Sequence, residues 1–279
     1  MVAISLADGR VVARLRTPPG PRSIESGPGG HAVVAHTGEG LLSLLDISGR
    51  RPRLRRVLDG VAVPRYTAMA PDGRTAYVTD SERGEVVVLD LERGRVARRT
   101  EVGAHARHLT LDPLGRTLWV ALGSKARALA VLDVADPRRP RLRRQIDPPF
   151  LAHDVGFSPS GRRVWVTSGD RRWLAVYAAG ASEPSALLAA DAPPQHVAFA
   201  AGLAFVASGD SATVRVHDLA TGRVVRTIDV PHGSFNVQQG AGRILTPSLE
   251  RGTLTVLDAR GRPRARRRVA RAAHDACVI

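Results

Sequence analysis

The feature that most constrains the fold is an internal repeat of about forty residues. Six copies of one strand-and-turn pattern follow one another, and the residue near the end of the third strand of each copy measures their spacing. These residues are Asp46, Asp90, Asp133, Tyr177, Asp218 and Asp258. Successive intervals are 44, 43, 44, 41 and 40 residues. Chance does not give five near-equal intervals with the same order of turns and strands, so the chain is a repeat protein.

Each copy contains short alternating segments. Stretches such as AYVTD at 76–80 and TVRVHD at 213–218 alternate apolar and polar residues, which is the two-residue period of a β-strand. Gly and Asp occur where short hairpins need them, as in PDG at 71–73 and ERG at 92–94. We therefore predict four short strands per copy and no helix.

Four short antiparallel strands make one blade of a β-propeller. The start of the chain, at 2–17, reads as the third and fourth strands of a blade, and AHDACVI at 273–279 reads as a first strand. We expect an all-β, seven-bladed propeller, a single domain whose ends share one incomplete blade; a β-sandwich is the fallback. The predicted blades span approximately 1–17 plus 274–279, 18–60, 61–103, 104–148, 149–192, 193–232 and 233–273. The missing second strand of the shared blade predicts that Met1 lies inside a longer protein.

Composition excludes several classes of protein. Hydrophobic residues make up 43% of the 279 residues, as in globular proteins, and no apolar run approaches the roughly 20 residues of a membrane helix. The single cysteine, Cys277, excludes an internal disulfide and a cysteine zinc cluster. The net charge of +15 comes almost entirely from arginine, since Lys125 is the one lysine. We interpret it first as a solvated basic surface.

The clearest copy, APDGRTAYVTDSERGEVVVLDLERGRV at 70–96, resembles the YVTN-repeat β-propeller proteins of bacteria and archaea, which are similar in shape to WD-repeat propellers. The residues Tyr77-Val78-Thr79-Asp80 stand at the position of the naming motif of that family. Looser copies are SPSGRRVWVTSGD at 158–170 and DPLGRTLWVALGS at 112–124. The resemblance implies a propeller of a kind that is often exported, and propellers in general serve in binding as well as in catalysis. The complete protein is then expected outside the cytoplasm, although this chain shows no signal peptide; it is expected in the cytoplasm if Met1 is the native start.

Polar residues gather at the starts of the predicted first strands, which a propeller brings to one mouth of its central channel. The two positions before the first apolar residue are Arg22-Ser23, Arg65-Tyr66, Arg107-His108, His153-Asp154, Gln195-His196, Phe235-Asn236 and His274-Asp275. The candidate ligand-binding residues among them are Arg22, Arg65, Arg107, His108, His153, Asp154, His196, Asn236, His274 and Asp275.

Three interpretations of this set stay open. The residues can be structural, bonding to loop backbone beside water. They can bind a small anion or peptide, with Arg22, Arg65 and Arg107 as fixed cationic groups on consecutive blades. They can hold a divalent metal through His108, His153, Asp154, His196, His274 or Asp275, although no spacing signature fixes such a site and no cofactor is predicted firmly. Neighbours on a strand point to opposite faces, so His153 and Asp154 are not required to meet.

The basic stretches at 50–58, 138–146 and 262–273 fall on the predicted fourth strands. Charge and proline protect such edges from pairing with other chains. The functional alternative is an anionic surface, and the scarcity of aromatic residues there argues against nucleic acid. Trp173, beside a loop, is expected to pack between blades.

From the residues we favour a non-enzymatic, monomeric propeller that binds a small anionic ligand or a protein at the channel mouth. The alternative is a lactonase-like hydrolase or a lyase that uses the His and Asp residues of the mouth, with or without a divalent metal. Neither a nucleophile motif nor a catalytic signature supports the enzyme.

Overall fold

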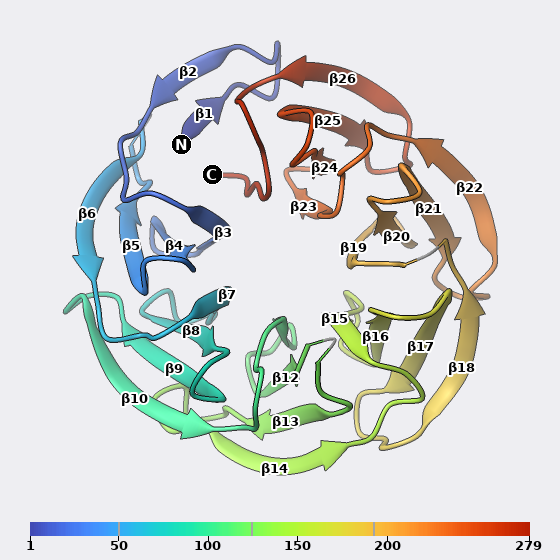
Figure 1. The fold of residues 1–279 in the computed structure, drawn as a ribbon, viewed down its shortest axis with the longest axis horizontal. Helices are drawn as coiled ribbons and strands as arrows, with labels where there is room; N and C mark the ends of the chain where they lie inside the picture. The colour runs from blue at the N-terminus through green and yellow to red at the C-terminus, as the bar shows by residue number, and fades with distance from the viewer. Residues whose placement is uncertain (50, 124, 192) are drawn as a thin grey trace. The chain divides into compact units, whose positions relative to one another are not determined.

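The computed structural model describes residues 1–49, 51–123, 125–191 and 193–279. In this part of the chain there is no helix, and the fold is a β-propeller of six four-stranded antiparallel blades with an additional two-stranded sheet (Figure 1). No helix long and apolar enough to cross a membrane is found among these residues. The chain divides into two compact units, residues 1–147 with Ile279, and residues 148–278.

The first unit holds the two-stranded sheet and three blades, each with its strands in chain order (Figure 1). The two-stranded sheet contains β1 (Val2–Ile4) and β2 (Val11–Arg14). The blades contain β3 (Pro21–Gly27), β4 (His31–His36), β5 (Leu41–Asp46) and β6 (Arg53–Leu58); β7 (Pro64–Met69), β8 (Thr75–Asp80), β9 (Glu85–Asp90) and β10 (Arg95–Glu101); and β11 (Leu109–Leu111), β12 (Thr117–Ala121), β13 (Leu129–Asp133) and β14 (Arg141–Ile146).

The second unit holds three further blades of the same order (Figure 1). They contain β15 (Ala152–Phe157), β16 (Arg163–Ser168), β17 (Trp173–Ala178) and β18 (Pro184–Ala189); β19 (His196–Ala200), β20 (Leu203–Ser208), β21 (Thr213–Asp218) and β22 (Val224–Asp229); and β23 (Gln238–Gly240), β24 (Arg243–Pro247), β25 (Thr253–Asp258) and β26 (Pro263–Arg268).

The repeat spacing read from the sequence is confirmed strand by strand. Five of the six spacing residues are the last residue of the third strand of a blade, and Tyr177 is the last but one. The aspartates end these strands because their carboxylates accept hydrogen bonds from the backbone of the following turn. In β21, for example, Asp218 accepts from the N–H and from the hydroxyl of Thr221, both at 2.8 Å.

The expectation of seven blades is wrong for the described residues, which form six. Strands β1 and β2 pair only with each other, and residues 274–279 lie in no strand. The terminal segment nevertheless packs on the β23–β26 blade. Val278 lies against Gly240 of β23, so that a Cβ added to Gly240 would come within 2.5 Å of the Val278 side chain. The first strands β15 and β19 pack in the same way, since a Cβ added to Gly156 would come within 2.7 Å of Val197. The terminal segment thus packs like a first strand but is not one of the paired strands of a sheet.

The second and third strands of each blade form its core. In β8, the consecutive residues Ala76, Tyr77 and Val78 are all fully buried, because a strand between two packed blades has both of its faces covered. Within the first unit, apolar residues of the β7–β10 blade form one core cluster with the β3–β6 blade and another with the β11–β14 blade. Within the second unit, the clusters likewise join consecutive blades.

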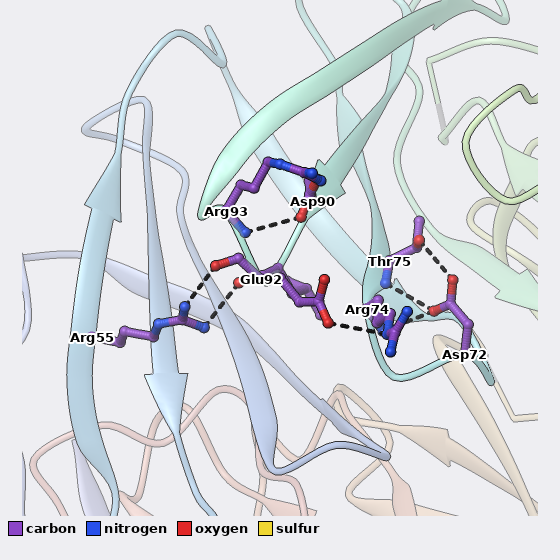
Figure 2. Close-up of polar contacts among 8 residues, drawn as sticks. Arg55, Asp72, Arg74, Thr75, Asp90, Glu92 and Arg93 are labelled. Atoms are coloured by element: carbon purple, nitrogen blue, oxygen red, sulfur yellow. Dashed lines mark hydrogen bonds and ion pairs between the residues drawn. The ribbon is translucent and has the colours of Figure 1, made fainter.

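The fourth strands are exposed and basic, and several of their arginines hydrogen-bond a neighbouring blade. Arg55 of β6 donates to the carbonyl oxygens of Leu91 and Glu92, at 2.9 and 2.7 Å, in the turn after β9 (Figure 2). Arg266 of β26 donates to the carbonyl of Asp229, at 3.1 Å. These contacts give part of the arginine excess a structural role. Trp173, expected to pack between blades, is instead 46% exposed.

Candidate functional site

Three of the six first strands, β3, β7 and β15, begin with an irregularity that positions candidate residues. The pairing of first and second strands shifts register between Pro21 and Ser23, between Pro64 and Thr67, and between Ala152 and Val155. Each shift is a β-bulge, and a bulge redirects the side chains of its extra residues. The bulged positions include Arg22, Arg65 with Tyr66, and His153 with Asp154, all of which the sequence placed at strand starts.

Hydroxyl groups hold these bulges against the next blade. Thr79, fully buried and the last residue but one of β8, accepts from the N–H of Tyr66 at 3.2 Å and donates to the carbonyl of Arg107 at 2.5 Å. Thr167 in β16 does the same, accepting from the N–H of Asp154 at 2.9 Å and donating to the carbonyl of Gln195 at 2.7 Å. One threonine therefore fixes the positions of two successive strand starts.

In the first unit, three half-buried guanidinium groups form the arginine cluster (Arg22, Arg65 and Arg107). Their strands are neighbours, since β7 contacts both β3 and β11, and the hydroxyl of Ser23 donates to the carbonyl of Arg65 at 2.8 Å. Burial, followed by the charges of Arg107 and Arg22, lowers the pKa of Arg65. The guanidinium of Arg65 donates through Nε to the hydroxyl of Ser81 at 3.1 Å.

Within the described part of the chain, the arginine cluster has no carboxylate partner. Among the described residues no ion pair includes any of the three arginines. In the same part of the chain, Nε of Arg22 and Nε of Arg107 are buried without a hydrogen-bond partner. Three positive charges therefore lie close together, and two of the guanidinium groups have an N–H donor without a hydrogen-bond partner in the described chain.

Beside the cluster, His108 is 1% exposed and its ring stacks on Tyr66, with 3.8 Å between ring centroids and 34° between ring planes. The structure thus brings together the predicted residues Arg22, Arg65, Arg107 and His108, which all belong to the first unit.

In the second unit, the candidate residues meet around His196. A ring nitrogen of His153 lies within 4.8 Å of one of His196, and the two rings stand edge to face, 5.8 Å apart at 78°. Nδ1 of His196 is 3.5 Å from Oδ2 of Asp154, which also accepts from the N–H of Val197 at 3.1 Å. Contrary to the alternation expected for a regular strand, His153 and Asp154 both face His196, because the bulge interrupts that alternation.

The remaining candidates form a separate contact. Asn236, fully buried, donates through Nδ2 to Oδ1 of Asp275 at 2.8 Å, and the same oxygen accepts from the N–H of Ala276. His274 is half-buried in this terminal segment. A role in metal binding for His108, His274 or Asp275 stays a prediction from the sequence.

Sequence reasoning missed the hydroxyl groups of Thr79, Thr167 and Ser23. For Thr79 and Thr167 a signal was present as the repeated Val-Thr near the end of the second strand, in AYVTD and in VWVTS. It could be recognised as a repeat, but not as the pair of hydrogen bonds that joins two blades.

Comparisons with known proteins support the fold alone. No family model and no curated protein matches the chain in sequence, so membership in the YVTN-repeat family stays a prediction. In structure, the chain is similar to hydrazine synthase of Kuenenia stuttgartiensis, with a TM-score of 0.79 and 15% identity over 94% of this chain and 90% of that one. At this identity the likeness defines a β-propeller and carries no activity with it.

Proposed function

We propose that this β-propeller is a binding protein for a small anion with two or more negative charges, such as a polycarboxylate or a phosphate compound. The ligand is bound by the arginine cluster, at the end of the blades where the first strands begin. The observation that carries the proposal is that Arg22, Arg65 and Arg107 lie close together and that none of them forms an ion pair with a carboxylate of the described chain.

Three like charges held close together destabilise the folded protein. An arginine in a protein keeps its proton, so the cluster stays cationic, and the burial of Arg65 weakens the screening by water. Neighbouring like charges then raise the free energy of the folded protein unless an anion lies between them. A bound polyvalent anion removes the repulsion and adds charge-assisted hydrogen bonds.

Pre-organisation supports the same conclusion. The backbones that carry Arg65 and Arg107 are fixed by the hydroxyls of Ser23 and Thr79, so little conformational entropy is lost when an anion binds. The net charge of +15 raises the local concentration of anions at the surface and speeds their association.

The test is isothermal titration calorimetry with citrate and with inorganic phosphate, at low and at moderate salt. One hydrogen-bonded charge is worth about 1.5–3 kcal/mol. Arg65→Gln should therefore weaken the binding of the better probe by roughly 10- to 150-fold. Binding by the wild-type protein should also weaken as salt rises.

The matched control is Arg98→Gln on β10, which removes the same charge from an exposed position. It should bind within twofold of the wild type. The proposal would be refuted if the wild type bound neither citrate nor phosphate. It would also be refuted if Arg65→Gln and Arg98→Gln lost the same amount of affinity. Equal losses would indicate that net charge alone attracts the anion.

A further inference from the structure

The second unit carries a group of metal-binding side chains that the arginine cluster does not use. His153 and His196 form the histidine pair, and Asp154 lies beside it. We infer that the histidine pair, with Asp154, forms a site for a divalent transition metal. This inference does not rest on the proposed anion binding, because none of its residues belongs to the arginine cluster.

The spacing of the donor atoms is close to what a metal needs. Two imidazole nitrogens bound to one zinc ion at ~2.0–2.1 Å lie roughly 3.4 Å apart when the geometry is tetrahedral. The nitrogens of the pair are within 4.8 Å, so a shift of about 1.5 Å or less brings them to that distance. The side chain of His153 is half-buried, and rotation about its side-chain torsions supplies a movement of this size.

Asp154 is placed either to bind the metal or to orient its ligand. Its Oδ2 lies 3.5 Å from Nδ1 of His196, a position that favours a proton on Nδ1, so that Nε2 would be the nitrogen that coordinates a metal. Metal-binding histidines commonly have a carboxylate at the other ring nitrogen, which fixes the tautomer and raises the basicity of the ring. Asp154 is itself fixed, since its N–H donates to Thr167 and its carboxylate accepts from Val197.

The bulge in β15 makes the donor set possible. In a regular strand His153 and Asp154 would point to opposite faces of the sheet, and only one of them could approach β19. The register shift between Ala152 and Val155 turns both toward His196, and bulges are frequent beside functional sites. Asp154 and His196 are 7% and 6% exposed, so these two side chains are shielded from water. His153 is half-buried, so an ion can reach the site from its side.

The donor types indicate the class of metal. Imidazole suits zinc, copper, nickel and cobalt, whereas calcium and magnesium prefer sites built from oxygen alone. Two imidazoles and one carboxylate leave coordination positions for water or an exchangeable ligand. The site is therefore expected to take Zn²⁺ or Co²⁺ and to reject Mg²⁺ at equal concentration.

The experiment is a titration of the chelator-treated full chain with Co²⁺, monitored by the visible d–d absorption of the ion, and then displacement by Zn²⁺. We expect saturation at one Co²⁺ per chain. His153→Gln, at the half-buried position, should raise the Kd at least tenfold, and Asp154→Asn should raise it by about 10- to 100-fold. Thermal unfolding of each variant without metal shows that it remains folded.

The control variant is His105→Asn, which removes an exposed imidazole; asparagine tolerates the positive φ of 63° found there. Its Co²⁺ affinity should stay within twofold of the wild type. The inference is overturned if the wild type takes up no Co²⁺ in a saturable manner. It is also overturned if folded His153→Gln binds Co²⁺ as tightly as the wild type, or if His105→Asn loses as much affinity.

Discussion

The carboxylate of Asp80 offers the sharpest test of how the turns join consecutive blades. Asp80 is fully buried at the end of β8. Its Oδ2 accepts from the N–H of Ala62 at 2.8 Å, and its Oδ1 accepts from the N–H of Val63 at 3.1 Å. Both donors lie in the connection between β6 and β7. Oδ1 also accepts from the backbone of Glu82 and Arg83, in the turn to β9.

The hydrogen bonds from these four N–H groups do not contribute equally to the free energy of unfolding. Glu82 and Arg83 are exposed, so water replaces the carboxylate there, whereas Ala62 and Val63 are half-buried. A hydrogen bond to a charged group is worth about 1.5–3 kcal/mol, and an unpaired buried donor costs a comparable amount. Two such donors give about 3–6 kcal/mol, and because Ala62 and Val63 are only half-buried the lower end applies, so Asp80→Ala should lower the free energy of unfolding by about 3–4 kcal/mol. Asp80→Asn keeps one acceptor oxygen and should cost about 1–2 kcal/mol.

The assay is urea unfolding followed by the fluorescence of the buried Trp119 and Trp165. With a slope near 3 kcal/mol per M, Asp80→Ala should lower the midpoint by roughly 1 M. The control is Glu101→Ala, which removes an exposed carboxylate on β10 and should stay within about 0.5 kcal/mol of the wild type. A shift below about 0.3 M for Asp80→Ala, or equal shifts for Ala and Asn, would refute this account of Asp80.

Two further predictions concern stability. Thr167→Val removes the hydroxyl that joins Asp154 to Gln195 and should cost about 1–3 kcal/mol in urea unfolding, because one donor and one acceptor lose their partner; a cost below 0.5 kcal/mol would contradict the bridging role. The pKa of Asp258 is lowered from 3.8 to about 2, mainly by the hydrogen bond from the backbone N–H of Arg262. The pKa of Asp218 is lowered by hydrogen bonds from Thr221. Since these folded-state pKa values are depressed, the stability they contribute is fully present above about pH 4 and is lost as pH falls toward 2. Asp258→Asn should make the melting temperature depend less steeply on pH between 4 and 2, and an unchanged slope would contradict the assignment.

Much of the fold could be predicted from the sequence because strand alternation and turn chemistry are local. The spacing from Asp46 to Asp258 followed from an aspartate that ends five of the six third strands, and each of these aspartates accepts hydrogen bonds from the turn that follows it. The number of blades was predicted wrongly, because residues 274–279 have the pattern of a first strand but no ladder partner. Pattern alone does not distinguish a segment that packs on a sheet from a strand that pairs in one.

The candidate site was predictable as a set of positions but not as contacts. Aligning the strand starts found Arg22, Arg65 and Arg107, because equivalent positions of neighbouring blades lie close together. It could not find the bulge that turns His153 and Asp154 to the same side, since a bulge depends on strand register. Nor could it divide the set into an arginine cluster in one unit and a histidine pair in the other.

The central claim is that the arginine cluster binds a polyvalent anion, and a crystal structure of the protein grown with selenate tests it most directly. We predict an anomalous selenium peak within hydrogen-bonding distance of the guanidinium groups of Arg22, Arg65 and Arg107, and no such peak in crystals of Arg65→Gln. Selenate found only on exposed fourth-strand arginines, with none at the cluster, would contradict it.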